Sequence, residues 1–367
     1  MKVPVRLGAF GCLMALTACG ENNGGNDGDP SGAAGIGGDS SGAGGAVAGE
    51  AGDAGNGGTG GAGDQAGQGG EAGAPPLPAV SRRQIGLGIE HGCAIDQSMT
   101  IVCWGEPIQD NGQVAPPAGS FVHLRSYGRT NCALNTADQF DCWGEPDWIS
   151  KGANTADFAI GYRHACVLTL DGAIHCYGDP GAPEGVSPDG TFREVVAGSN
   201  ITCGLTTDLS LSCWGNDDHG ITSVPAGEFV HLAVGDDHAC AIRREDRSVA
   251  CWGAGGPNDP NFEQPNGVHF GQSIPPAGAF VDIAAGNLHT CGIREDGTVA
   301  CWGAGTITGD CTATIDECGQ ADPVGGTFRQ LAAGYSHSCG LLDDGSIACW
   351  GSNTGNRATP PTDFRAW

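Results

Sequence analysis

Histidine and cysteine, two residue types that bind metals, recur along this sequence at fixed spacing. The clearest copy runs from Gly286 to Gly303 and contains His289, Cys291 and Cys301, with ten residues from the first cysteine to the second. Such groups could ligate a metal ion, or the cysteines could be oxidised to a disulfide. Cysteine-based metal sites usually contain closely paired cysteines, which this pattern lacks. We therefore expect disulfides, and no metal or other cofactor.

The pattern recurs seven times, and each copy contributes one pair of cysteines. The seven pairs are Cys93 with Cys103, Cys132 with Cys142, Cys166 with Cys176, Cys203 with Cys213, Cys240 with Cys251, Cys291 with Cys301, and Cys339 with Cys349. If each copy folds as a β-hairpin with a turn such as Asp296-Gly297, the two cysteines lie opposite each other within bonding distance. A further pair, Cys311 and Cys318, is expected to join two parts of a loop.

Five of the copies carry a histidine two residues before the first cysteine. These are His91, His164, His238, His289 and His337. Because the repeat itself places them, we expect each to form hydrogen bonds within its own repeat rather than to act in catalysis. The tryptophan that follows the second cysteine in six copies is expected to pack between neighbouring repeats.

The repeats must be built from strands. An apolar run such as Phe121–Leu124 or Phe280–Ile283 precedes each hairpin, and a fourth short strand fits in the Gly/Pro-rich connection. Successive first cysteines lie 34 to 51 residues apart, which fits a propeller blade. The prediction is an all-β, seven-bladed β-propeller with one disulfide inside each blade. Residues 364–367 look like the start of another strand and are expected to close the ring by pairing with the first blade.

The unit Gly-x-x-His-x-Cys-x-Ile, followed by Asp-Gly-x-x-x-Cys-Trp-Gly, resembles the repeat of the regulator of chromosome condensation family, whose members are seven-bladed propellers. The sequence departs from the eukaryotic pattern in its shorter blades and in its cysteines. These departures bring it nearer to short-repeat secreted bacterial members, which include a β-lactamase inhibitor protein. The resemblance also implies guanine-nucleotide exchange, which we do not expect because an exported protein would not meet a cytosolic GTPase.

The first residues resemble an export signal. Lys2 and Arg6 precede an apolar stretch, and the segment Leu16-Thr17-Ala18-Cys19 resembles a bacterial lipobox. We expect residues 1–18 to be a lipoprotein signal peptide and Cys19 to be lipidated; an ordinary signal cut nearby is the alternative. Because Gly20 follows, the resemblance favours the outer membrane or cell surface. Residues 19–78, rich in Gly, Ala, Asn and Asp, are expected to form a disordered linker before the propeller at 79–367.

Charge and motifs limit the range of functions. The formal net charge of -26 argues against nucleic acid as a partner. No Ser-His-Asp ordering or phosphate-cradling glycine motif points to catalytic residues. We therefore expect a monomeric, non-enzymatic cell-envelope lipoprotein that binds a protein, or a glycan. A secreted enzyme inhibitor and an envelope hydrolase or lyase with loop carboxylates are the alternatives.

Binding residues are expected where the symmetry of the repeats breaks. The two longest connections, residues 254–279 and 304–327, follow the fifth and sixth repeats. The candidate binding residues are Trp148, Asn261, Phe262, Glu263, His269, Phe270, Asp310, Asp316 and Glu317.

Overall fold

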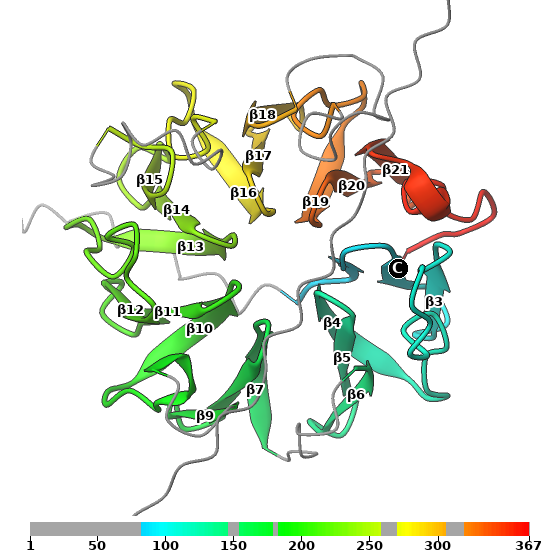
Figure 1. Ribbon diagram of the computed structural model, residues 1–367, viewed down its shortest axis with the longest axis horizontal. Helices are drawn as coiled ribbons and strands as arrows, with labels where there is room; N and C mark the ends of the chain where they lie inside the picture. The colour runs from blue at the N-terminus through cyan, green and yellow to red at the C-terminus, as the bar shows by residue number, and fades with distance from the viewer. Residues whose placement is uncertain (1–81, 146–153, 179–182, 258–269, 306–318, 367) are drawn as a thin grey trace, which may run out of the picture. The chain divides into compact units, whose positions relative to one another are not determined.

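The computed structural model describes residues 82–145, 154–178, 183–257, 270–305 and 319–366, all of which belong to one unit, Ala72–Trp367. These residues form seven three-stranded antiparallel sheets arranged around a common centre (Figure 1). The predicted seven-bladed β-propeller is thereby confirmed. The predicted signal peptide, Cys19, the predicted linker and the pair of Cys311 and Cys318 lie outside the described residues.

Each blade has an inner, a middle and an outer strand in chain order. Blades one to three comprise β1 (Ile85–Leu87), β2 (Gly92–Ile95), β3 (Ile101–Trp104), β4 (Phe121–Tyr127), β5 (Thr130–Asn135), β6 (Phe140–Gly144), β7 (Thr155–Ile160), β8 (His164–Thr169) and β9 (Ile174–Gly178). Blades four and five comprise β10 (Phe192–Ala197), β11 (Ile201–Thr206), β12 (Leu211–Gly215), β13 (Phe229–Val234), β14 (His238–Arg243) and β15 (Val249–Gly253). Blades six and seven comprise β16 (Phe280–Ala285), β17 (His289–Arg294), β18 (Val299–Gly303), β19 (Phe328–Ala333), β20 (His337–Leu342) and β21 (Ile347–Gly351).

Two short 3-10 helices, η1 (Pro183–Gly185) and η2 (Thr354–Asn356), lie in connections after outer strands. Among the described residues, no helix has the length and apolar character needed to cross a membrane.

The expected fourth strand is not found in the described parts of the connections, where each sheet stops at three strands. The connection between β3 and β4 shows the physical reason. It contains Pro116 and Pro117, which have no backbone N–H to donate to a neighbouring strand.

The seven repeat disulfides form as predicted, each between the middle and outer strands of one blade. In chain order they join Cys93 to Cys103, Cys132 to Cys142, Cys166 to Cys176, Cys203 to Cys213, Cys240 to Cys251, Cys291 to Cys301, and Cys339 to Cys349.

The register of the hairpins explains why these cysteines meet. Cys203 and Cys213 are directly paired in the register of β11 and β12, and their Cα atoms are 4.0 Å apart. The eleven-residue spacing of Cys240 and Cys251 leaves the register unchanged, because the turn takes up the additional residue with Arg247 at a φ of 58°.

Burial differs between the two cysteines of each bond. Those of the middle strands are fully buried, whereas those of the outer strands are only partly buried, because the outer strand lies at the edge of its sheet. The partly buried cysteines are Cys103, Cys142, Cys176, Cys213, Cys251, Cys301 and Cys349.

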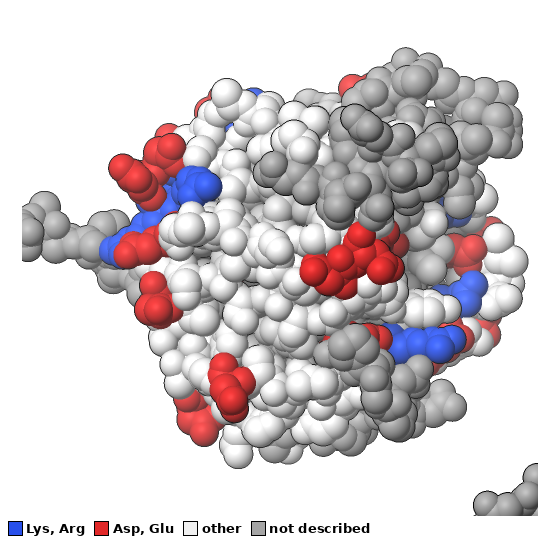
Figure 2. Space-filling view, turned by 60° about the vertical axis from the view of Figure 1, so that its left-hand side comes forward, with Lys and Arg blue, Asp and Glu red and all other residues white. Residues whose placement is uncertain are grey.

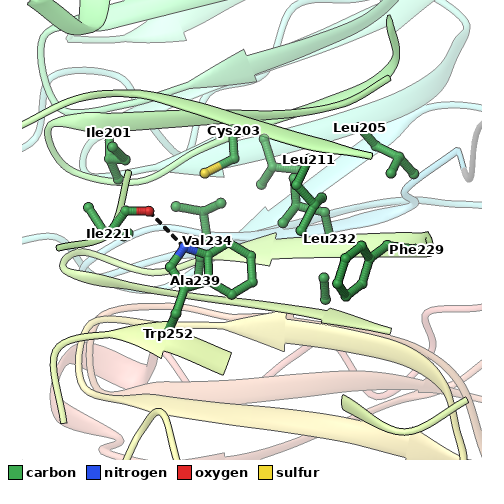
Figure 3. Close-up of a cluster of buried hydrophobic side chains, with 12 residues drawn as sticks. Ile201, Cys203, Leu205, Leu211, Ile221, Phe229, Leu232, Val234, Ala239 and Trp252 are labelled. Atoms are coloured by element: carbon green, nitrogen blue, oxygen red, sulfur yellow. Dashed lines mark hydrogen bonds between the residues drawn. The ribbon is translucent and has the colours of Figure 1, made fainter. Parts of the chain in front are cut away.

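The hydrophobic core lies between blades. Figure 3 shows the cluster between blades four and five, to which β11 contributes Ile201 and Leu205 and β13 contributes Phe229 and Leu232. Trp252 completes it, and its indole N–H donates to the carbonyl of Ile221 at 2.7 Å. The predicted packing of tryptophan between repeats is therefore present here.

The ring is closed by residues from both ends of the described chain. Residues 364–366 lie beside the first blade in Figure 1. The N–H of Gln97 in blade one donates to the carbonyl of Arg365, and the N–H of Ala366 donates to the carbonyl of Gly345 in blade seven. Phe364 is buried in the cluster between these two blades.

Blade two makes the same two bonds within its own continuous chain. Thr136 donates to the carbonyl of Ser120, and Phe121 donates to the carbonyl of Met99 in the preceding blade. Arg365 and Ala366 therefore begin the inner strand of blade one, and β1 continues it. The predicted pairing with the first blade is confirmed for Arg365; residue 367 lies outside the described part.

Candidate functional site

A central cavity of about 710 Å³ is lined by residues from all seven blades. All seven inner strands run in the same direction along the cavity, so the residues at their starts lie at one end and those at their ends lie at the other. We call the end where the inner strands begin the ring end, and the end where they turn into the middle strands the mouth.

The ring end carries one buried polar side chain from each blade. In six of the inner strands this residue follows a shift in the strand register, which changes the direction of the side chain. The seven residues of this polar ring are Gln84, His123, Asp157, Glu194, His231, Asp282 and Gln330.

Arg83 crosses the polar ring and joins distant blades. Its guanidinium pairs with Asp282 at 2.8 Å and contacts His231, and its backbone N–H donates to Nδ1 of His123 at 2.6 Å. His231 also pairs with Glu194 at 3.0 Å. These contacts tie blade one to blades two, five and six.

The two aspartates of the polar ring stay ionised. Burial alone raises the pKa of Asp157, but Arg125 and the hydrogen bond from His123 outweigh burial and hold that pKa well below its usual range. Burial likewise raises the pKa of Asp282, and Arg83 and His231 bring it far down. The polar ring is thus a network of paired charges. Within the described residues, no group of three or more His, Cys, Asp or Glu side chains could hold a metal ion.

The repeated histidines join neighbouring blades, which corrects the expectation of bonds within one repeat. Nε2 of four of these five histidines lies within hydrogen-bond distance of a side-chain oxygen of the next blade, because the ring points across the gap between the sheets. The pairs are His91 with Asn131 at 2.8 Å, His164 with Thr202 at 2.6 Å, His238 with Thr290 at 2.7 Å and His289 with Ser338 at 2.7 Å.

Where a blade lacks the histidine, the next blade lacks the oxygen. Thr130 replaces histidine in blade two, and the residue that would face it in blade three is Ala165. Ile201 replaces it in blade four, and blade five has Ala239. Both partners change together, so neither the histidine nor its partner oxygen is present alone at these two junctions.

His337, the fifth repeated histidine, does not form such a pair with the next blade. The corresponding residue of blade one is Gly92, so neither ring nitrogen of His337 has a side-chain partner among the described residues. A side chain at position 92 has no space, because a Cβ there would lie 2.3 Å from the ring of Trp104.

All four tyrosines of the chain lie on the side of the propeller where the mouth is, three of them at the cavity and one on an outer strand. Tyr127, Tyr162 and Tyr335 line the cavity. Tyr177 lies on β9 one residue before its mouth end, and it stands where six other repeats have tryptophan. The mouth therefore differs from the ring end in exposing aromatic side chains with polar tips.

One tyrosine spans the mouth. The hydroxyl of Tyr127, in blade two, donates to Oδ1 of Asp236, in blade five, at 2.6 Å. Burial and the adjacent Asp237 raise the pKa of Asp236 to about 6, against the opposing effect of the Tyr127 hydrogen bond. A carboxylate with a raised pKa inside a cavity is typical of functional sites.

Tyr127 replaces a glycine of the other blades. In blades three and five, a Cβ on Gly161 or Gly235 would lie 2.1 Å or 2.5 Å from the ring of the histidine three residues later. In blade two that histidine is replaced by Thr130, which removes this particular clash with position 127. Blade four also lacks the histidine but keeps Gly198, where a Cβ would lie 1.8 Å from the carbonyl oxygen of Gly235, so the loss of the histidine alone does not make room for a side chain.

Of the candidate binding residues from the sequence, only Phe270 is described. It is partly buried, and its N–H donates to the side chain of the buried Gln272 at 2.9 Å. Trp148, Asn261, Phe262, Glu263, His269, Asp310, Asp316 and Glu317 lie outside the described residues. Tyr127, Tyr162 and Asp236 were not among the predicted site residues, although the repeats do show that three of the four tyrosines fall at or next to the turn after an inner strand.

Fold and site together define a disulfide-linked seven-bladed β-propeller with a buried polar ring at one end of its cavity and tyrosines at the other. Three of its segments, residues 156–181, 280–306 and 328–356, match the family model of the regulator of chromosome condensation (RCC1) repeat. These three segments of the chain therefore carry RCC1-type repeats. No curated protein matches it.

Solved structures share the fold. The CRINKLY WD40 ectodomain of the Arabidopsis thaliana receptor kinase ACR4 has a TM-score of 0.57 at 23% identity, and 73% of this chain and 97% of that chain are covered. The ectodomain of the Physcomitrella patens receptor kinase CR4 has a TM-score of 0.59 at 22% identity, with 74% and 73% covered. Human WBSCR16 has a TM-score of 0.52 at 14% identity, with 74% and 87% covered.

Proposed function

We propose that this protein is an exported, lipid-anchored and monomeric binding scaffold without enzymatic activity, and that it binds a protein partner through the mouth face. The observation that supports this most is the gathering of all four tyrosines at that face. Tyrosine supplies a large contact area and a polar tip at little conformational cost, which is why it is enriched at protein interfaces.

Two of these tyrosines are exposed in blade three. Tyr162 is 58% exposed, and the guanidinium of Arg163 lies 5.5 Å from the centre of its ring. Tyr177 is 43% exposed. Tyrosine and arginine are the residue types that most often dominate binding energy in protein interfaces.

The opposite face has a different character. Its turns carry aspartates whose side chains accept hydrogen bonds within the turn, as Asp296 does from Thr298 and Asp344 from Ser346. These bonds lower the pKa of both carboxyl groups, so they are fixed in the ionised form. In Figure 2 most of the described surface is uncharged, and acidic side chains lie on it in separate groups.

The cellular location follows from the chemistry of the cysteines. Seven disulfides require an oxidising compartment, so the propeller is expected to be exported. In this proposal, a lipid on Cys19 tethers it to the outer membrane or cell surface.

Site-specific photo-crosslinking tests the binding face. A photoreactive amino acid at position 162, before β8, is expected to capture a specific envelope protein. The same group at position 170, just after β8, serves as the control, because Leu170 is 63% exposed at the opposite end of the same strand. The captured protein is then purified for direct binding measurements.

The double variant Tyr162→Ala/Tyr177→Ala is expected to weaken that binding at least tenfold, while Leu170→Ala leaves it within twofold. Equal crosslinking from both positions, or unchanged affinity of the double variant, would show that the mouth is not the binding face.

A further inference from the structure

The bond between Tyr127 and Asp236 joins two turns that lie 109 residues apart in the chain. It is absent from the repeat pattern, since the other six repeats have glycine in the place of Tyr127. The disulfides of all the other blades form without such a bond, as do the histidine and tryptophan contacts of blades five and six. This departure from symmetry inside the cavity is where a specific ligand contact is expected.

The charges around Asp236 define what would bind there. Asp237 follows it in the same turn, and the hydroxyl of Ser199 from blade four contacts Tyr127. Glu184 and Arg163 also line the cavity, and the Arg163 guanidinium lies over the ring of Tyr162.

The two other guanidinium groups of the lining are at the ring end, where Arg83 pairs with Asp282 and Arg125 pairs with Asp157. A carboxylate removed from bulk water and flanked by a second carboxylate strongly favours a nearby cation.

We propose that the mouth holds the ammonium group of a lysine side chain of the partner protein, which donates to Asp236 beside the ring of Tyr127. This rests on the proposed function, because it names the chemistry by which the partner engages the mouth face. The apolar stem of a lysine can lie along the tyrosine rings while its ammonium reaches the carboxylate. A guanidinium binds best to both oxygens of a carboxylate, and Tyr127 already occupies Oδ1; a compact ammonium needs only one oxygen.

Saturation-transfer NMR on the full mature protein tests this with two small probes, N-acetyl-lysine N-methylamide and its norleucine analogue, which has a stem of similar length and no charge. The lysine probe is expected to bind in the millimolar range at pH 7.5, and the norleucine probe at least tenfold more weakly. Because the pKa of Asp236 is about 6, affinity for the lysine probe is expected to fall about tenfold at pH 5.

Two charge-matched variants assign the effect. Asp236→Asn is expected to abolish the preference for lysine over norleucine. Asp296→Asn removes one charge at the opposite face and is expected to leave the affinity within twofold. Tyr127→Phe retains the ring but removes a bond that lowers the pKa of Asp236, so the pH at which binding is half lost is expected to rise.

Equal binding of the two probes, retention of the preference in Asp236→Asn, or an equal loss in Asp296→Asn would overturn the lysine proposal. If the partner captured from position 162 then still bound Asp236→Asn normally, the mouth face would stand as the binding surface and only the lysine contact would fail. If the photoreactive group at position 162 captured no specific protein even with Asp236 intact, the proposed function itself would be overturned.

Discussion

The bond between His238 and Thr290 offers a quantitative test of how neighbouring blades are joined. Nε2 of the histidine lies 2.7 Å from the threonine hydroxyl, and both residues are fully buried. Thr290→Ala removes the hydroxyl and leaves a buried imidazole nitrogen without a partner. Losing the bond and leaving that nitrogen unsatisfied costs about 1–3 kcal/mol of the free energy of unfolding.

The chain itself supplies the compensating change. Blades four and five meet through Ile201 and Ala239 at the same two positions. The double variant His238→Ile/Thr290→Ala copies that pair, so the unsatisfied nitrogen is removed together with its partner. We therefore expect the double variant to recover most of the stability lost by Thr290→Ala, to within about 1 kcal/mol of the wild type.

Guanidinium chloride unfolding of the four proteins in this cycle, followed by tryptophan fluorescence with the disulfides intact, measures the coupling. Because a propeller of seven blades need not unfold in one step, native-state hydrogen exchange of β14 and β17 gives an independent local measure. If the effects of the two single substitutions simply add, the blades are not joined by this bond, and the explanation of the histidine pattern is wrong.

Two further predictions concern acid stability and the anchor. Burial lowers the pKa of His164 and His289 to about 4, and of His238 and His337 to about 3, from a normal value of 6.5. Since the unfolded chain then binds more protons than the folded one, the free energy of unfolding should fall as the pH drops from 6.5 towards 4; a denaturation midpoint that is unchanged between pH 7.5 and pH 5 would refute this. Replacing the predicted lipidated residue, Cys19→Ser, is expected to move the protein from the membrane to the soluble fraction on cell fractionation; retention of the variant on membranes would argue against the lipid anchor.

The fold could be read from the sequence because its determinants are local. Cys203 and Cys213 belong to one hairpin, so their spacing fixes which residues face each other across two adjacent strands. The repetition of that hairpin then predicts the number of blades. The sequence left room for a short fourth strand in each connection, and the described parts of the connections contain none, because turn residues and prolines occupy them.

The contacts between blades could not be read in the same way. The motif His-x-Cys has the same sequence whether the histidine bonds within its own sheet or to the next sheet. The packing angle between the sheets determines which partner the histidine reaches. Yet the sequence did contain the signal. Thr130 is matched by Ala165 and Ile201 by Ala239, a pairing between successive repeats that becomes meaningful once the direction of the bond is known. Tyr127 and Asp236 lie three blades apart and have no such pattern.

The two side chains that cross the central cavity show how its two ends differ in charge. Arg83 enters a ring of paired carboxylates and histidines in which each charge has an opposite charge beside it, so the ring end is stable without a ligand. Tyr127 instead offers a neutral hydroxyl to Asp236, and a carboxylate that accepts from a neutral donor keeps its full negative charge. A propeller built from near-identical repeats can keep this carboxylate, bonded to a neutral hydroxyl, at one end of its cavity. The polar ring at the other end, the disulfides and the histidine bonds hold the blades together.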